Sequence, residues 1–330
     1  MSGLLTPLTV KGHTLRNRIV MPPMENQKAT EGGEVTDALL EHYVRHAQAG
    51  VGMVIVEYTY VQPDGRGRLQ QLGVHNDAMI PGLKRLVKAV QACGVVIGLQ
   101  ISHGGGKCPS EFAGRTPISA SDVVVPGASE QSQGATKDEI TGIISSFAQA
   151  ARRAVEAGFD FIEVHGAHGY LLSEFLSPLT NTRTDEYGGD ITARGRFPLT
   201  VVHAIRDEIG ADVLVLYRLG ANDYKEGGLT LDEGKYMARS LVDAGVDLLD
   251  ISGGLNGASV PGWDEISQGY FVPMAAEIRR EVNVPVVVAG GITDPRYADS
   301  VIREGKVDLV AVGRALLENP DWPKDAQSVL

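Results

Sequence analysis

Residues 160–176 read DFIEVHGAHGYLLSEFL, a buried-type strand followed by a cluster of side chains that can handle protons. The apolar run 161–164 lies between glycines, which is typical of a strand in a parallel sheet. His165, His168 and Tyr170 follow directly, on a loop that contains two glycines. This spacing lets two imidazoles approach one atom while a phenol approaches from another side. Two structural histidines, or a pair of metal ligands, are the alternative interpretations.

The same succession of apolar run, polar or glycine-rich loop, amphipathic helix and glycine recurs along the chain. Alternation of buried-type strands with helices predicts an α/β fold, a (β/α)8 TIM barrel, as a single domain over residues 1–330. An open doubly wound sheet is the alternative, but it calls for a GxGxxG turn after the first strand, and the sequence has none there. The eight expected strands are Arg18–Met21, Gly52–Val56, Val95–Ile101, Phe161–Val164, Val213–Tyr217, Leu248–Ile251, Val286–Ala289 and Leu309–Val312.

Capping residues mark the ends of the expected helices. Thr136 with Glu139 and Thr230 with Glu233 predict capping boxes, and Asp294 precedes a first-turn proline. Glycines in the left-handed conformation are expected to end the helices. They are Gly50, Gly94, Gly158, Gly210, Gly245 and Gly305.

Charge and composition restrict the possible partners. The formal net charge of -11 argues against binding to nucleic acid or to an anionic membrane surface. No secretory leader and no apolar run long enough to span a bilayer is apparent. Cys93 and Cys108 form neither a CxxC pair nor a disulfide framework, so we expect a cytoplasmic protein.

In a barrel of this kind, the residues that follow each strand form the active-site face. Gly290 and Gly291 after the seventh strand and Gly313 after the eighth let backbone N–H groups approach a phosphate, and Arg314 adds a planar charged fork. Gln100 offers a donor and an acceptor to the edge of a heterocyclic imide, and Arg218 could stabilise negative charge on a ring. Singly, a glycine pair usually serves a turn and an arginine usually pairs with a carboxylate. Together they outline a site for flavin mononucleotide (FMN).

Over essentially its full length, the chain resembles the Old Yellow Enzyme family of FMN-dependent ene-reductases. The resemblance is carried by LLTPLTVKGHTLRNRIVMPPM at 4–24, Gln100 with SHGGGK, EVHGAHGYLLSEFLSPLTNTRTDEYGG at 163–189, Arg218 with NDY, VAGGIT and VGRALLENP. The block at 163–189 is the most specific of these. The final glycine motifs alone would also suit other phosphate-binding barrels.

The resemblance implies FMN as cofactor and NADH or NADPH as reductant. It places Pro23, Met24 and residue 25 near the reactive N5 of the flavin, Gln100 at the pyrimidine edge and Arg218 beside N1 and O2. It assigns the phosphate to Gly290, Gly291, Gly313 and Arg314. The full set of expected cofactor-binding residues is Pro22, Pro23, Met24, Glu25, Tyr58, Gln100, Arg218, Ser252, Gly253, Gly290, Gly291, Gly313 and Arg314.

For catalysis, the resemblance implies a small electrophilic alkene as substrate: an unsaturated carbonyl, nitro or enoyl-thioester compound. His165 and His168 would donate hydrogen bonds to the substrate oxygen, and Tyr170 would deliver a proton from the opposite face. Gln27 and His103 are expected in the substrate pocket.

Several positions depart from the family pattern. Glu25 replaces a Cys or Thr; if ionised near the flavin it should lower the reduction potential, unless it is only a solvated loop residue. Tyr58 stands where relatives have a small residue, so it either narrows the pocket or packs. Gly106 replaces an Arg that reaches the flavin, which leaves Lys107 as the nearby cation.

Three alternatives remain open at this point. The chain also resembles the flavin barrel of 2,4-dienoyl-CoA reductases and amine dehydrogenases, but without the cysteine-rich segment that ligates an iron–sulfur cluster, so no cluster is expected. A metal-dependent lyase or hydrolase would use His165 and His168 with Glu163 or Asp250. A flavin-binding barrel without turnover would act through partners. Homo-oligomer formation through the outer helices is compatible with the sequence.

Overall fold

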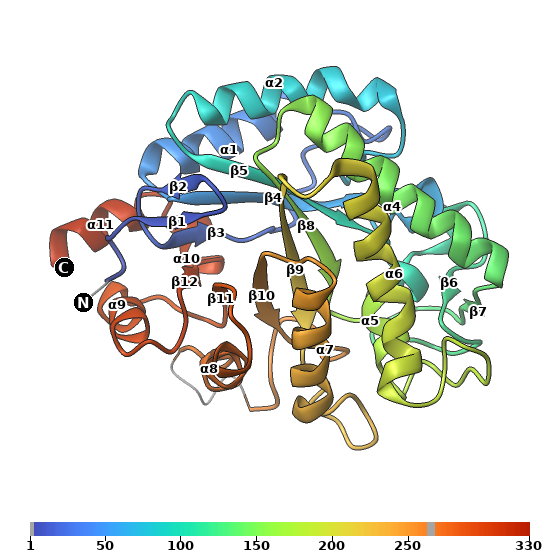
Figure 1. Ribbon diagram of the computed structural model, residues 1–330. Helices are drawn as coiled ribbons and strands as arrows, with labels where there is room; N and C mark the ends of the chain where they lie inside the picture. Colours follow the sequence, from blue (N-terminus) through green and yellow to red (C-terminus); the bar gives the residue numbers. More distant parts are fainter. Residues whose placement is uncertain (1–2, 263–267) are drawn as a thin grey trace.

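The computed structural model describes residues 3–262 and 268–330. At its centre is a closed barrel of parallel strands with helices around the outside (Figure 1). The barrel closes where β12 pairs with β3 and Val310 lies opposite Ile19. The predicted (β/α)8 barrel is therefore confirmed. Its strands are β3 (Ile19–Met21), β4 (Met53–Tyr60), β5 (Val96–Ser102), β8 (Phe161–Gly166), β9 (Leu214–Gly220), β10 (Leu248–Ser252), β11 (Val286–Val288) and β12 (Leu309–Ala311).

Helices follow the strands and pack their apolar faces on the barrel (Figure 1). The long helices α4 and α6 lie against each other, and α2 packs beside α4. The helices are α1 (Asp37–Ala49), α2 (Ile80–Gln91), α3 (Ser110–Ala113), α4 (Lys137–Ala157), α5 (Leu171–Leu176), α6 (Ile191–Ile209), α7 (Leu231–Asp243), α8 (Val272–Glu281), α9 (Pro295–Arg303), α10 (Arg314–Glu318) and α11 (Trp322–Val329). In residues 3–262 and 268–330, the single turns of 3-10 helix are η1 (Pro63–Gly65), η2 (Asp77–Met79) and η3 (Gly105–Lys107).

Capping residues begin and end these helices as predicted. Both capping boxes form: the Thr136 hydroxyl accepts from the Glu139 N–H at the start of α4, and Thr230 does the same for α7. Asp294 caps α9. All six glycines expected at helix ends have positive φ, and Gly50 and Gly158 are left-handed C-caps, but Gly210 has ψ -177° and is not in the left-handed helical conformation.

Some strands extend beyond their apolar runs. β4, β5 and β9 continue to Tyr60, Ser102 and Gly220, because backbone pairing persists where the inward side chains become polar. An irregularity in the β4–β5 pairing lies between Val56 and Thr59. The polar ends of these strands form the floor of the site.

Two short strand pairs were not predicted. The hairpin of β1 (Leu8–Val10) and β2 (His13–Leu15) packs Val10 and Leu15 onto the apolar residues inside the barrel, and so covers one end of it. β6 (Ile118–Ser119) pairs with β7 (Gln133–Gly134) within the connection between β5 and β8. Within the described residues, no helix has the length and apolarity that crossing a bilayer requires. A single domain over residues 1–330 stays a prediction.

Candidate active site

Inside the barrel, apolar side chains give way to polar ones toward the carboxyl ends of the strands. Phe161 on β8 belongs to the apolar interior, and Glu163 and His165 follow it on the same face. Leu214 and Leu216 precede Arg218 on β9 in the same way. This end of the barrel therefore combines a rigid frame with buried polar groups.

Arg218 lies between buried carboxyl groups on neighbouring strands. Its Nε is 3.2 Å from the Asp250 Oδ2, and Gln100 donates to the Glu163 Oε2 at 2.7 Å. Burial raises the pKa of the Glu163 carboxyl well above its usual range, and the nearby Asp250 raises it further. Burial also raises the pKa of Asp250, while Arg218 lowers it. Burial and the neighbouring Asp250 thus favour the protonated form of Glu163, whereas Arg218 favours the ionised form of Asp250.

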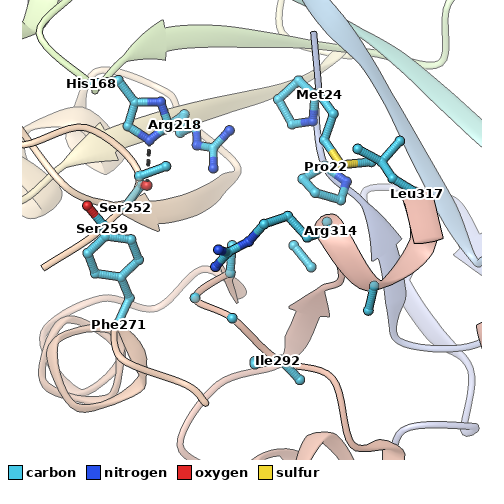
Figure 2. A pocket seen from close by; sticks show the side chains of 18 of the residues that line it. Pro22, Met24, His168, Arg218, Ser252, Ser259, Phe271, Ile292, Arg314 and Leu317 are labelled. Atoms are coloured by element: carbon cyan, nitrogen blue, oxygen red, sulfur yellow. Dashed lines mark hydrogen bonds between the residues drawn. The ribbon is translucent and has the colours of Figure 1, made fainter. Parts of the chain in front are cut away.

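A cavity of about 700 Å3 opens above this floor. Figure 2 shows the side chains of Arg218 and Arg314 turned into it from β9 and from the start of α10. Its volume falls in the usual range for cofactor and ligand sites, about 300–1,000 Å3. The cavity is lined by Pro22, Pro23, Met24, Glu25, Tyr58, His165, His168, Tyr170, Arg218, Ser252, Ala258, Ser259, Tyr270, Phe271, Ala289, Gly290, Gly291, Ile292, Thr293, Ala311, Gly313, Arg314, Ala315, Leu317 and Glu318.

His165, His168 and Tyr170 form one wall of the cavity. The ring centre of His165 lies 5.2 Å from that of His168 and 4.9 Å from that of Tyr170. His165 ends β8, while His168 sits in the following loop at φ 61°, a left-handed conformation that turns the chain back toward the cavity. The wall is thus built by one strand end and one strained turn.

Both imidazoles are neutral at physiological pH. Burial lowers the pKa of His165 and of His168 well below the ordinary value, and the charge of Arg218 lowers both further. The His165 Nδ1 accepts from the Ala167 N–H at 3.3 Å, so the ring proton is on Nε2. The His168 Nε2 lies 2.7 Å from the Ser252 hydroxyl, drawn as a dashed line in Figure 2. Each ring is therefore oriented by the protein. His165 keeps its Nε2–H to donate, and His168 keeps an Nδ1–H to donate when its Nε2 accepts from the Ser252 hydroxyl.

Tyr170 is a protonated phenol beside a second tyrosine. Burial raises the pKa of Tyr170, and a hydrogen bond with Tyr58 lowers it in part. Tyr58 in turn donates to the Glu25 Oε2 at 2.6 Å, and the Glu25 Oε1 is 3.3 Å from the Arg68 Nε. Glu25 is therefore a charge-paired member of the site.

The opposite part of the cavity is suited to an anion. Gly290 and Gly291 have φ of 128° and 66°, and a Cβ on Gly291 would lie 2.9 Å from the Tyr270 ring, so only glycine fits. The Tyr270 hydroxyl donates to the Ala258 carbonyl at 2.7 Å and lies 3.3 Å from the Arg314 Nη2. Arg314 is thereby held with its guanidinium in the cavity.

Four residues that the sequence placed in the site do not line this cavity: Gln27, Gln100, His103 and Gly253. Gln27 donates its amide to Glu25 at 2.8 Å instead. The ring of His103 is buried against Gly65, where a Cβ would meet it at 2.6 Å, and its Nε2 is 3.6 Å from Asp64. Neither Gln27 nor His103 lines the cavity, and their substrate-pocket positions stay predictions.

Sequence reasoning missed the aromatic pair Tyr270–Phe271. Their ring centres are 4.8 Å apart in the cavity wall, just before α8. No motif marked them, and the only signal was the length of the connection between β10 and α8. Gly253 follows the lining residue Ser252, and Gln100 donates to the buried Glu163 below the cavity; their cofactor contacts stay predictions.

The residues present fit an FMN molecule. The Gln100 Oε1 is a buried acceptor without a hydrogen-bond partner in the described residues, which suits the N–H of an imide edge. Arg314 and the glycine turn at 290–291 provide for a phosphate. The cavity is large enough to place a planar ring between these two ends.

Comparisons with known proteins agree with this geometry. A model of the NADH:flavin oxidoreductase / NADH oxidase family matches residues 3–330. The NADH oxidase of Thermoanaerobacter brockii is 42% identical over 318 residues, which are 95% of this chain and 49% of that protein. An NADPH dehydrogenase of Geobacillus sp. (strain WCH70) is 41% identical over 328 residues, 99% of this chain and 94% of that protein.

Solved structures support the same family assignment. An old yellow enzyme homologue from Zymomonas mobilis superposes with a TM-score of 0.86 at 27% identity, over 99% of this chain and 92% of the other. The chain spans about half the length of the NADH oxidase and nearly all of the NADPH dehydrogenase. A metal-dependent lyase or hydrolase is not favoured, since these relatives are flavin and nicotinamide enzymes. From the match over residues 3–330 and the fit of the cavity, the chain belongs to the NADH:flavin oxidoreductase / NADH oxidase family, the Old Yellow Enzyme family, whose members use FMN with NADH or NADPH.

Proposed function

We propose that this chain reduces activated C=C bonds in unsaturated carbonyl, nitro or enoyl-thioester compounds, with NAD(P)H as reductant. The proposal rests on one observation: His165, His168 and Tyr170 share one wall of the cavity that fits FMN. Bound FMN supplies the hydride that reaches the β-carbon of the alkene.

The histidines stabilise the charge that develops on the substrate. As hydride reaches the β-carbon, electron density moves to the carbonyl or nitro oxygen. Neutral rings fixed by Ala167 and Ser252 donate hydrogen bonds to that oxygen without reorganising. Because burial keeps the pKa of both rings low, they do not themselves provide the proton.

Tyr170 provides the proton that completes the reaction at the α-carbon. Burial raises the pKa of its phenol above the ordinary value, so the group is protonated over the physiological pH range. Its place beside His165 puts the acid close to the oxygen-binding groups.

The test separates the two half-reactions of FMN-loaded enzyme by anaerobic stopped-flow spectroscopy. In Tyr170→Phe, we expect reduction by NAD(P)H to persist and reoxidation by an enone to slow about 100- to 10,000-fold. In His165→Ala, loss of one oxyanion donor should slow reoxidation about 100- to 1,000-fold. Tyr236→Phe, at a partly buried position of α7 that lines neither cavity, is the matched control and should behave as wild type. Reoxidation at the wild-type rate in Tyr170→Phe would refute the assigned role.

A further inference from the structure

A second, smaller cavity of about 270 Å3 adjoins the main one. The two share Tyr58, His168, Tyr170 and Ala258 in their walls. A molecule whose reacting group meets the histidines and Tyr170 can therefore extend directly into the second cavity.

The walls of the second cavity are cationic. Arg68 and Lys107 supply its charged groups, and none of the described residues that line it is Asp or Glu. The rest is largely glycine backbone: Gly67, Gly104, Gly127 and Gly257. In a chain of net charge -11, a concave surface of this sign is a local exception.

Lys107 is a partly buried cation held in place by the catalytic loop. Its Nζ donates to the His168 carbonyl at 2.7 Å. Gly169 leaves the space for it, because a Cβ there would lie 2.9 Å from that nitrogen. Among the residues that the structure describes, no carboxylate oxygen lies within ion-pair distance of Lys107; burial lowers its pKa, and attraction to Glu174 raises it in part. Such a group gains from a bound counter-charge.

Arg68 is only partly neutralised. Its Nε pairs with Glu25 at 3.3 Å, and its Nη1 donates to the Gly67 carbonyl at 2.9 Å. The other Glu25 oxygen, Oε2, accepts from the Tyr58 hydroxyl, and Glu25 lines the main cavity. With its side chain 49% exposed, the guanidinium keeps N–H groups available to a ligand.

We infer that the second cavity is a subsite for a carboxylate or phosphate group carried by the molecule that occupies the main cavity. This inference rests on the proposed function for its connection to alkene reduction. The anionic group has two possible sources, the tail of the unsaturated substrate and the pyrophosphate of the nicotinamide dinucleotide. The shared requirement is negative charge placed a short distance from the reacting atoms.

Inorganic pyrophosphate tests the subsite without turnover. Calorimetric titration of oxidised, FMN-loaded enzyme should show an affinity that weakens with added salt. Loss of one cation should reduce that affinity about fivefold to tenfold in Arg68→Gln and in Lys107→Met. Lys107→Arg should retain it, and so should Lys84→Met, which removes an exposed charge on α2. Equal affinity in Lys107→Met and Lys84→Met would overturn the inference.

The two half-reactions then identify the source of the anion. A carboxylate-bearing enone and its methyl ester are compared as oxidants, and NADH and NADPH as reductants. A fall in the carboxylate-to-ester preference of Lys107→Met identifies the substrate tail, whereas weaker NAD(P)H binding identifies the dinucleotide. If neither changes, no ligand of the main cavity uses the subsite and the inference fails. If no alkene is reduced but pyrophosphate binding behaves as expected, the proposed function fails and the anion subsite stands.

Discussion

His165 and His168 illustrate how burial selects a chemical role for a side chain. Burial disfavours the imidazolium form and lowers the pKa of each ring, and the positive charge of Arg218 lowers both pKa values further. The neutral ring remains a hydrogen-bond donor, but it is a poor proton source. Because the neutral imidazoles are poor proton sources, we assign proton delivery to the phenol of Tyr170.

Glu25 and Arg68 form a charge pair whose two halves should act on the flavin in opposite directions. Removing the carboxylate in Glu25→Gln should raise the reduction potential of bound FMN, because an anion disfavours the reduced, more negative ring. Removing the cation in Arg68→Gln should lower it. A change of about 30 mV corresponds to about 1.4 kcal/mol for a two-electron couple. Spectroelectrochemical titration measures both, and shifts of the same sign would refute the electrostatic explanation.

Side-chain direction limited what could be predicted at the residue scale. Most expected site residues line the cavity, because they follow strands whose ends meet on one face of the barrel. His103 also follows a strand, but its ring turns toward Gly65 and Asp64. Gln27 is held by Glu25. The sequence shows how far along a barrel strand a residue lies. The direction of its side chain depends on neighbours that are distant in the sequence, so it could not be predicted.

Elements with long periodic patterns were predicted well, and short ones were not. The eight barrel strands follow from apolar runs between helices with clear caps. The β1–β2 hairpin has only three residues in each strand, too few for periodicity to show, yet Val10 and Leu15 cover the barrel base. Whether such short strands form depends on their burial against the rest of the fold, which their own sequence pattern does not reveal.

The capping box of α4 gives a test at this scale. Thr136→Ala removes the hydroxyl that accepts from Glu139 N–H, and we expect the free energy of unfolding to fall by about 1 kcal/mol. Thr141→Ala is the control on the same helix, since its exposed hydroxyl only donates back to the Lys137 carbonyl. Denaturant titration compares the two. Equal stability of Thr136→Ala and wild type would contradict the capping role.

At the scale of the whole molecule, buried carboxyl groups tie stability to pH. Burial raises the pKa of Glu174 from 4.5 to about 8, with a partial offset from its hydrogen bond to the Gly106 N–H. Between pH 4.5 and about 8, Glu174 is protonated in the folded chain and ionised in the unfolded chain. This group therefore contributes stability at low pH that is lost as pH rises toward 8, at up to about 1.4 kcal/mol per pH unit.

Glu174→Gln should remove that dependence. We expect the free energy of unfolding of the variant, relative to wild type, to increase as pH rises from about 5 to about 8 and then to level off. Thermal and denaturant unfolding across this range measure it. Glu111→Gln, at an exposed position of α3, should show a constant difference. A constant difference for Glu174→Gln as well would mean that its carboxyl is ionised in the fold.

The barrel as a whole acts as a rigid holder that brings strand ends distant in sequence around one cavity. We propose that Arg218 and Arg314 would hold FMN in this cavity, whose wall carries His165, His168 and Tyr170. Anaerobic absorbance spectroscopy of FMN-loaded, purified protein tests this most directly. We predict an isoalloxazine spectrum that bleaches with NADH or NADPH and returns when an enone is added. Protein that retains no flavin, or a reduced flavin that no activated alkene reoxidises, would contradict the account.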